Sequence, residues 1–404
     1  MISKIIKFNS EENIIKYLYS LEVDPAGINI MKNKISGYSI EVREIRVPAA
    51  LIMKQELLSL GGDLAIPKDF IVSEDITKTG TVLIIASLKQ LNILIKKIML
   101  QQFGLDLLAK QLVQLISKRE KYWRFKNFNF NCSKNNYHLM SIINITPDSF
   151  YDGGKFYNNT DAVLKFAEQE IRDGAEMLDI GGESARPGSI PVDENEEINR
   201  VIPAIKELKK KFPDTALSID STKYNVVYAA LNEGADIIND ISGLTKEPRF
   251  VQLAREYNAG LVLMHIKGIP ETMQINPVYN NLMNDIIDFL GRAVETAVNS
   301  GVSKDSIIID PGIGFGKTPE HNLEILARLN ELSLFGTGIL IGLSNKSFLG
   351  KILNLEIDKR ITATATANSF AFKNGASIFR VHNIKENKIS LELTKKISEI
   401  IIKN

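Results

Sequence analysis

Short apolar runs alternate with amphipathic segments over the C-terminal two thirds of the chain. The apolar runs are rich in Ile, Val and Leu, end in polar or glycine residues, and lie at 138–145, 176–180, 216–219, 236–238, 260–264, 306–309, 338–343 and 377–381. The segments between them have helical periodicity and include 161–172, 194–211, 281–299 and 323–331. Strands that alternate with helices predict parallel βα units, and strands that are apolar throughout predict burial on both faces.

Eight such units in roughly 265 residues match a (β/α)8 TIM barrel, which typically has about 250 residues. A doubly wound open sheet is the structural alternative. It would concentrate polar side chains at one or two switch points, whereas here a polar cluster follows nearly every strand. The pattern therefore favours the closed barrel.

The first 120 residues follow a different pattern. Pro48 opens an Ala- and Leu-rich segment that Gly61-Gly62 would end, which predicts a helix. Residues 82–86 are typical of a strand, and 88–99 and 105–117 of helices. We predict an α/β protein in which a small α/β N-terminal domain (1–123), whose role the sequence leaves open, precedes a linker (124–136) and the barrel (137–404).

The amino-acid composition disfavours several classes of protein. The 404 residues include 49 basic and 48 acidic side chains, and the resulting formal charge of +1 disfavours a globally basic nucleic-acid binder. Cys132 is the only cysteine, which excludes an intrachain disulfide and a Cys-rich zinc site. The first 20 residues lack the apolar core of a signal peptide, and no apolar run approaches the length of a membrane span. We expect a cytoplasmic protein without membrane contacts.

Functional groups of a barrel enzyme lie at the C-terminal ends of its strands. Four such residues, Asp220, Asn239, Asp310 and Lys346, could converge at the barrel mouth. Carboxylates accept paired N–H donors, an amide both donates and accepts, and a lysine donates to a carbonyl or ring nitrogen. Together they suit a flat nitrogen heterocycle with an amidine edge.

A second group of strand-end residues suits phosphate. Arginines bind phosphate oxygens with two N–H groups, a histidine can donate to them, and an Asn oxygen can bind Mg²⁺. The group consists of Asn144, Arg186, Arg380 and His382. Because strands 1 and 8 of a closed barrel are neighbours, the phosphates would lie on one side of the heterocycle.

Seven motifs in this order resemble those of the dihydropteroate synthase family, the pterin-binding enzymes of folate synthesis. They are NITPDSFYDGG (144–154), GGESARPG (181–188), SIDSTK (218–223), IIND (237–240), DPGIGFGK (310–317), SNKS (344–347) and RVH (380–382). The resemblance spans roughly 137–400 and is specific because all seven motifs fall at expected strand ends. The N-terminal region lies outside the family's catalytic core.

The resemblance implies a Mg²⁺-dependent transferase that joins 6-hydroxymethyl-7,8-dihydropterin diphosphate to p-aminobenzoate and releases pyrophosphate. Carried over by motif, the pterin is held by Asp220, Asn239, Asp310 and Lys346, and the diphosphate by Arg186, Arg380, His382 and Asn144, which also binds Mg²⁺. The p-aminobenzoate side is lined by Phe150, Pro187, Phe315, Lys346 and Ser347. Asp220, Lys346, Arg380 and His382 would be catalytic. The family usually forms homodimers, so we expect a homodimer.

Two departures fall on the acceptor side. Ala185 stands where the family usually has Thr, and Asn345 where it usually has Arg. Pterin and diphosphate recognition therefore look intact, while acceptor affinity, acceptor identity and sulfonamide response stay open.

Other interpretations compete with these assignments. Asp220 and Asp310 could be helix N-caps, His265 could pack below the site, and His138 and His321 fit structural roles. Residues 312–318 resemble a phosphate-binding loop, but Pro311 occupies the position of its first glycine. Gly312 and Gly314 would instead let the backbone approach the ligand. A pterin-dependent methyltransferase and a non-catalytic pterin-binding protein are the alternative functions.

Overall fold

The computed structural model describes residues 11–117, 120–147, 156–157, 159–184, 191–269 and 272–400. The chain divides into two compact units, Met1–Lys118 with Glu399–Asn404, and Arg119–Ser398. Each unit is described by itself. Among the described helices, none has both the length and the apolar character of a membrane span.

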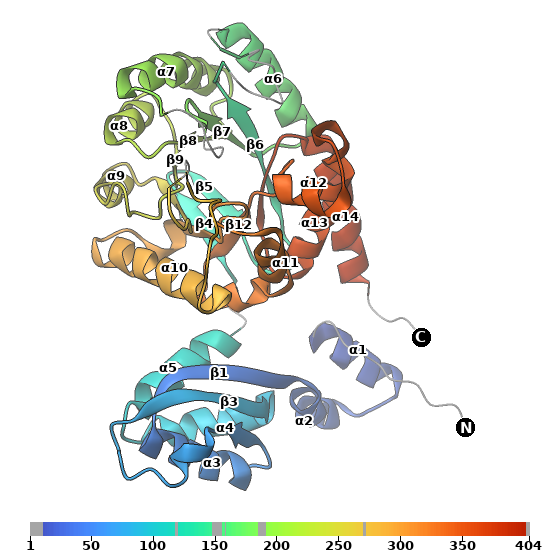
Figure 1. Ribbon diagram of the computed structural model, residues 1–404. Helices are drawn as coiled ribbons and strands as arrows, with labels where there is room; N and C mark the ends of the chain where they lie inside the picture. The colour runs from blue at the N-terminus through green and yellow to red at the C-terminus, as the bar shows by residue number, and fades with distance from the viewer. Residues whose placement is uncertain are drawn as a thin grey trace. The chain divides into compact units, whose positions relative to one another are not determined.

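The N-terminal unit contains a three-stranded antiparallel sheet in the order β1–β3–β2 (Figure 1). Its strands are β1 (Gly37–Arg46), β2 (Asp63–Ala65) and β3 (Thr79–Ser87), and its helices are α1 (Glu11–Ser20), α2 (Pro25–Ile35), α3 (Val47–Ser59), η1 (Lys68–Phe70), α4 (Leu88–Ile98) and α5 (Leu105–Ile116). Alternate residues of β3, Val82 and Ile84, are buried against α3 and α4. The small α/β fold predicted for this region is confirmed, although the prediction missed β1.

Eight parallel strands of the second unit close into a barrel (Figure 1). In chain order they are β6 (His138–Asn144), β7 (Met177–Gly181), β8 (Ala216–Asp220), β9 (Ile237–Asp240), β10 (Gly260–Met264), β11 (Ile307–Asp310), β12 (Gly338–Ile341) and β13 (Ile378–Val381). Pairing of β13 with β6, through Ile378 opposite His138, completes the ring. The predicted TIM barrel is confirmed and the open sheet is excluded.

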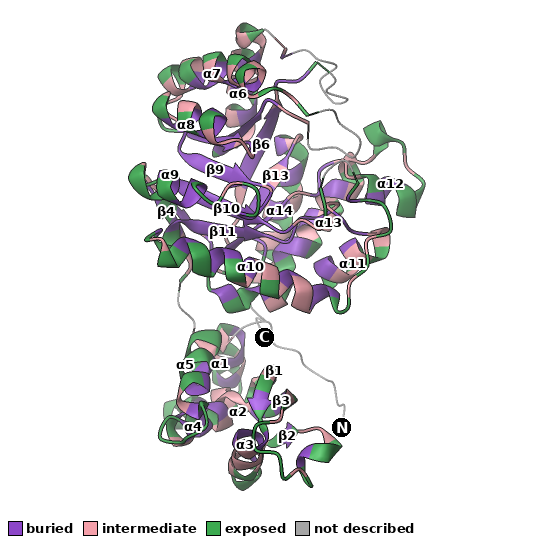
Figure 2. Ribbon diagram, turned by 60° about the vertical axis from the view of Figure 1, so that its left-hand side comes forward, coloured by how far each residue is buried: buried purple, intermediate pink, exposed green. Residues whose placement is uncertain are grey.

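Helices surround the strands and turn their apolar faces inward. They are α6 (Thr160–Asp173), α7 (Glu194–Lys211), α8 (Tyr224–Asn232), α9 (Phe250–Glu256), α10 (Leu282–Asn299), η2 (Lys304–Ser306), α11 (Pro319–Ala327), η3 (Leu329–Phe335), α12 (Ser347–Leu353), η4 (Ile357–Lys359), α13 (Ile361–Lys373) and α14 (Ile384–Glu399). Figure 2 shows the barrel strands almost wholly buried and the helices buried on one side. The apolar core between strands and helices therefore fixes where the strand ends lie.

Two short strands, β4 (Tyr122–Phe125) and β5 (Phe128–Asn131), form a hairpin at the N-terminal ends of the barrel strands. Trp123 is fully buried with Met140 and Val262, and its indole N–H donates to the Ser306 carbonyl at 2.9 Å. The segment expected as a linker, 124–136, therefore adds Phe125, Phe130 and Cys132 to the buried core of the barrel. Four-residue strands are too short to show a clear period in the sequence, and only packing against the barrel reveals the aromatic alternation.

Candidate active site

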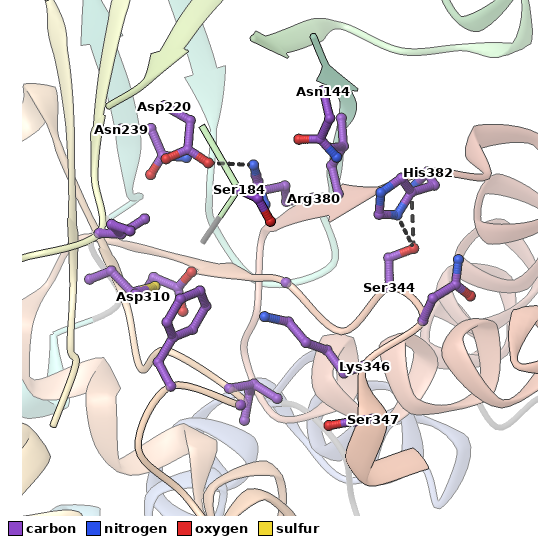
Figure 3. Close-up of a pocket in the computed structure, with 18 of the residues that line it drawn as sticks. Asn144, Ser184, Asp220, Asn239, Asp310, Ser344, Lys346, Ser347, Arg380 and His382 are labelled. Atoms are coloured by element: carbon purple, nitrogen blue, oxygen red, sulfur yellow. Dashed lines mark hydrogen bonds and ion pairs between the residues drawn. The ribbon is translucent and has the colours of Figure 1, made fainter. Parts of the chain in front are cut away.

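A cavity of about 480 Å³ opens at the C-terminal ends of the barrel strands. Every predicted site residue that the structure describes lines it: Asn144, Asp220, Asn239, Asp310, Phe315, Lys346, Ser347, Arg380 and His382 (Figure 3). Arg186, Pro187 and Phe150, together with Ala185, lie outside the described residues. The barrel thus brings together side chains that are up to 238 positions apart, from Asn144 to His382.

Arg380 forms ion pairs with two carboxylates, that of Asp220 in the cavity lining and that of the buried Asp179 beside it. Its Nε lies 2.5 Å from Asp179 Oδ2, and its Nη2 lies 2.6 Å from Asp220 Oδ2 (Figure 3 shows the second pair). From the sequence, Arg380 is predicted to belong with the phosphate-binding residues. The structure places it against the heterocycle group, where it orients Asp220.

Asp179 is a residue of the site to which the sequence analysis gave no role. It is fully buried, and besides Arg380 it accepts hydrogen bonds from Asn239 Nδ2 at 3.2 and 3.3 Å. The acidic side chain inside the otherwise apolar strand Met177–Gly181 was the available signal, because a buried charge needs a partner. Asp179 therefore fixes two neighbours, Asn239 and Arg380, that do line the cavity.

Burial raises the pKa values of two cavity carboxylates. Desolvation raises the pKa of Asp220 to about 7, against the lowering effect of Arg380. Desolvation also raises the pKa of Asp310 to about 6, although the Gly312 N–H donates to its Oδ1 at 2.7 Å. Buried carboxylates of this kind favour a ligand that presents N–H donors or positive charge. Neither side chain caps the helix after its strand, since Lys223 and Thr318 occupy those N-cap positions.

Lys346 extends into the cavity from the loop between β12 and α12 (Figure 3). Its Nζ lies 4.2 Å from the centroid of the Phe315 ring, a cation–π distance. Its positive charge also lowers the pKa of Asp310, against the raising effect of burial. Lys346 therefore lies between the heterocycle group and the predicted acceptor side.

Asn144 is the last residue of β6, and His382 directly follows the neighbouring strand β13. His382 Nδ1 lies 3.0 Å from Ser344 Oγ, a contact that sets the orientation of the imidazole (Figure 3). The described residues contain no cluster of three His, Cys, Asp or Glu side chains that could enclose a metal. The amide oxygen of Asn144 fits a Mg²⁺ that takes its other ligands from phosphate and water, which is how Mg²⁺ commonly binds beside phosphates.

A buried pair, His265 and Lys317, lies next to the cavity without lining it. Lys317 Nζ lies 2.9 Å from His265 Nδ1 and donates to the Phe315 carbonyl at 2.9 Å. Burial lowers the pKa of His265 to about 2 and lowers the pKa of Lys317 well below its usual range. Lys317, which the sequence analysis did not single out, therefore ties the loop after β11 to the loop after β10.

Gly312 was expected to let the backbone approach a ligand. Its φ is +68°, and an added Cβ would overlap the carbonyl oxygen of His265. Glycine is therefore required by the close approach of two protein loops. His138 and His321 have structural contacts, since His138 bonds to Glu176 and His321 forms a capping box with Thr318.

Comparison with known proteins connects this geometry to a family. The family model described as "Pterin binding enzyme" matches residues 140–382 and leaves the N-terminal unit outside. The dihydropteroate synthase of Clostridium beijerinckii is 42% identical over 266 residues, which are 66% of this chain and 95% of that protein. The dihydropteroate synthase of Escherichia coli K12 is 39% identical over 249 residues, 62% of this chain and 87% of that protein.

Solved structures have the same barrel. A Yersinia pestis dihydropteroate synthase in complex with a sulfonamide drug has a TM-score of 0.66 and 37% identity, covering 69% of this chain and all of that one. The Xanthomonas albilineans enzyme with 4-aminobenzoic acid has a TM-score of 0.64 and 31% identity, covering 70% and 100%.

Proposed function

Because the chain belongs to the family of pterin-binding enzymes, we propose that it catalyses the dihydropteroate synthase reaction of folate biosynthesis. It joins 6-hydroxymethyl-7,8-dihydropterin diphosphate to p-aminobenzoate, giving 7,8-dihydropteroate and pyrophosphate. The observation that carries the proposal is the cluster of acceptors Asp220, Asn239 and Asp310, the last two of them buried, with Lys346, Arg380 and His382 in one cavity.

The cluster suits both halves of the chemistry. Asp220, Asn239 and Asp310 bind the N–H donors of the pterin, and their carboxylates stabilise the positive charge that spreads into the ring as the C–O bond to diphosphate breaks. Arg186, Arg380 and His382 bind the departing anion. The arylamine nitrogen attacks the freed carbon directly, so the reaction needs no Ser or Cys nucleophile.

The acceptor is proposed to bind beside Lys346, Ser347 and Phe315. The resemblance assigns Phe150 and Pro187, which lie outside the described residues, to the same subsite. The aromatic ring of the acceptor packs on Phe315, and its amine faces the pterin. Lys346 contributes to both subsites because its ammonium group lies between Asp310 and Phe315.

Turnover by the purified full-length protein is the direct test. Incubation with the pterin diphosphate, p-aminobenzoate and Mg²⁺ should release pyrophosphate in proportion to dihydropteroate formed. Omission of p-aminobenzoate and the Lys346→Ala protein are the controls. Tight binding of the pterin diphosphate without release in the presence of any arylamine would contradict synthase activity and favour a non-catalytic pterin-binding protein.

We also propose that Mg²⁺ binds at Asn144 together with the substrate diphosphate. When bound, the ion supplies positive charge that stabilises the departing pyrophosphate. Removal of Mg²⁺ with a chelator should abolish turnover, and added Mg²⁺ should restore it. Asn144→Ala should raise the Mg²⁺ concentration needed for half-maximal rate, whereas full activity in chelator would exclude the requirement.

The protein is further proposed to act as a cytoplasmic homodimer. Three apolar residues of α14, Ile389, Leu393 and Ile397, follow one another at intervals of four and are 58–63% exposed. A second copy could cover this stripe. Sedimentation of the wild type should give a dimer and Leu393→Glu a monomer, while a wild-type monomer at micromolar concentration would contradict the proposal. Cell fractionation tests the location.

A further inference from the structure

The loop that carries Lys346 is held in place through the backbone of Asn345. The Asn345 N–H donates to Thr364 Oγ1 of α13 at 3.2 Å, and the Asn345 carbonyl accepts from Arg360 Nη1 at 3.2 Å. The Asn345 φ is +54°, a left-handed conformation that Asn tolerates better than most residues. Its side-chain oxygen is buried and has no hydrogen-bond partner among the described residues. The side chain at position 345 therefore does not anchor this loop.

Arg360 contacts the same segment at three points. Besides the Asn345 carbonyl before α12, it donates from Nε to the Leu355 carbonyl after α12 at 3.2 Å. Between these points its guanidinium lies against the backbone of α12, because a Cβ added at Gly350 would overlap Arg360 Cζ, Nε and Nη2. Arg360 also lines the cavity. One planar side chain thus connects the start, the middle and the end of the segment 345–355.

We propose that Arg360 is a positioning residue for the acceptor half of the reaction. It holds Lys346 and Ser347 in the conformation that receives the p-aminobenzoate carboxylate, a role that the side chain of residue 345 does not fill here. The inference rests on the proposed synthase function. The pterin contacts of Asp220, Asn239 and Asp310 come from other strands, so weakening Arg360 should act mainly on the acceptor.

Two variants disturb the contact in different ways. Arg360→Met removes the donors, whereas Gly350→Ala leaves the charge but pushes the guanidinium off α12. Alanine is otherwise favourable at a helical position. Lys359→Met and Lys351→Met, which remove exposed cations on the same two segments, are the matched controls.

The measurements are the KM for p-aminobenzoate, kcat, and the dissociation constant of the pterin diphosphate by titration, all on the full-length protein. We expect Arg360→Met and Gly350→Ala to raise the acceptor KM about tenfold or more, with less than about threefold change in pterin affinity, because small displacements of binding groups have large effects. Arg360→Lys should stay impaired, since an ammonium group cannot make both donations. The control variants should match the wild type.

Three results would overturn the inference: an unchanged acceptor KM, equal losses for acceptor and pterin, or full rescue by Arg360→Lys, which would show that charge alone matters. If Arg360→Met does not fold, Thr364→Val removes the other anchor of Asn345 and should raise the acceptor KM in the same direction. An unchanged KM in that variant also contradicts the proposal. Absence of turnover in the wild type would instead contradict the proposed function.

Discussion

Arg380 Nε lies 2.5 Å from Asp179 Oδ2, and Asp179 is fully buried below the cavity floor. The ion pair fixes the direction in which the guanidinium faces Asp220. Three carboxylates, those of Asp179, Asp220 and Asp310, raise the pKa of Arg380, although burial by itself would lower it. A residue that does not line the cavity therefore sets the orientation of one that does.

Replacement of Asp179 by Asn tests whether the buried carboxylate orients Arg380. The amide keeps the shape but leaves the cation of Arg380 with one carboxylate fewer, and breaking a buried pair typically costs about 3–5 kcal/mol. We expect weaker binding of the pterin diphosphate and a turnover lower by orders of magnitude. Asp305→Asn removes an exposed partner of Arg124 and is the control. Wild-type pterin affinity in the Asp179 variant would refute this role.

The raised pKa of Asp310 predicts a pH dependence of stability. Its pKa is about 6 in the folded protein against an ordinary value of 3.8. Between these pH values the unfolded chain has released a proton that the folded protein still holds, so the free energy of unfolding falls as pH rises. The stabilisation is complete below about pH 4 and is lost as pH rises through 6, on the order of 3 kcal/mol.

The Asp310→Asn protein should lack this pH-dependent contribution to the free energy of unfolding. Urea unfolding at pH 4, 5, 6 and 7 should show the wild type losing stability relative to the variant as pH rises, on top of a constant offset from the changed hydrogen bond to Gly312. Parallel pH profiles would mean that the carboxyl does not titrate in this window.

Gly312→Ala should be far more damaging than Gly375→Ala. Both glycines have positive φ, +68° and +102°, so both variants lose roughly 1–2 kcal/mol from backbone strain. Only at Gly312 would the new methyl group overlap a protein atom, the His265 carbonyl oxygen, whereas nothing lies within 4 Å of the position at Gly375. Equal shifts of the urea midpoint in the two variants would refute the steric argument.

Trp123 should matter for the stability of the barrel. Trp123→Ala empties a fully buried site among Met140 and Val262 and should lower the unfolding free energy by about 3–5 kcal/mol. Tyr122→Ala, on the partly exposed side of the same strand, should have a small effect. Calorimetry of both proteins measures the difference.

The hairpin also decides where the N-terminal unit can be removed. A protein that starts at Glu120 keeps β4 and β5 and should melt as the barrel of the full-length chain does. A protein that starts at Asn136 lacks Trp123, Phe125 and Phe130 and should not fold. Turnover of the longer form equal to that of the full-length protein would show that the N-terminal unit is not needed for catalysis.

The barrel could be predicted from the sequence because its strands are buried on both faces. Such strands are mainly apolar, and most of their polar residues lie where each strand ends, so both the eight elements and the cavity residues from Asn144 to His382 could be recognised along the chain. The seven motifs added the chemistry. These features depend on residues that are near one another in the chain, so they can be recognised in the sequence alone.

Only the tertiary structure showed which side chains form hydrogen bonds and ion pairs with one another. Asp179 meets Arg380 across 201 positions, and Trp123 meets the Ser306 carbonyl across 183. No spacing rule connects such pairs, because they meet only after the ring of strands has closed. The sequence by itself determined which residues stand at the mouth of the barrel, and the closed fold determined which of them hold one another in place.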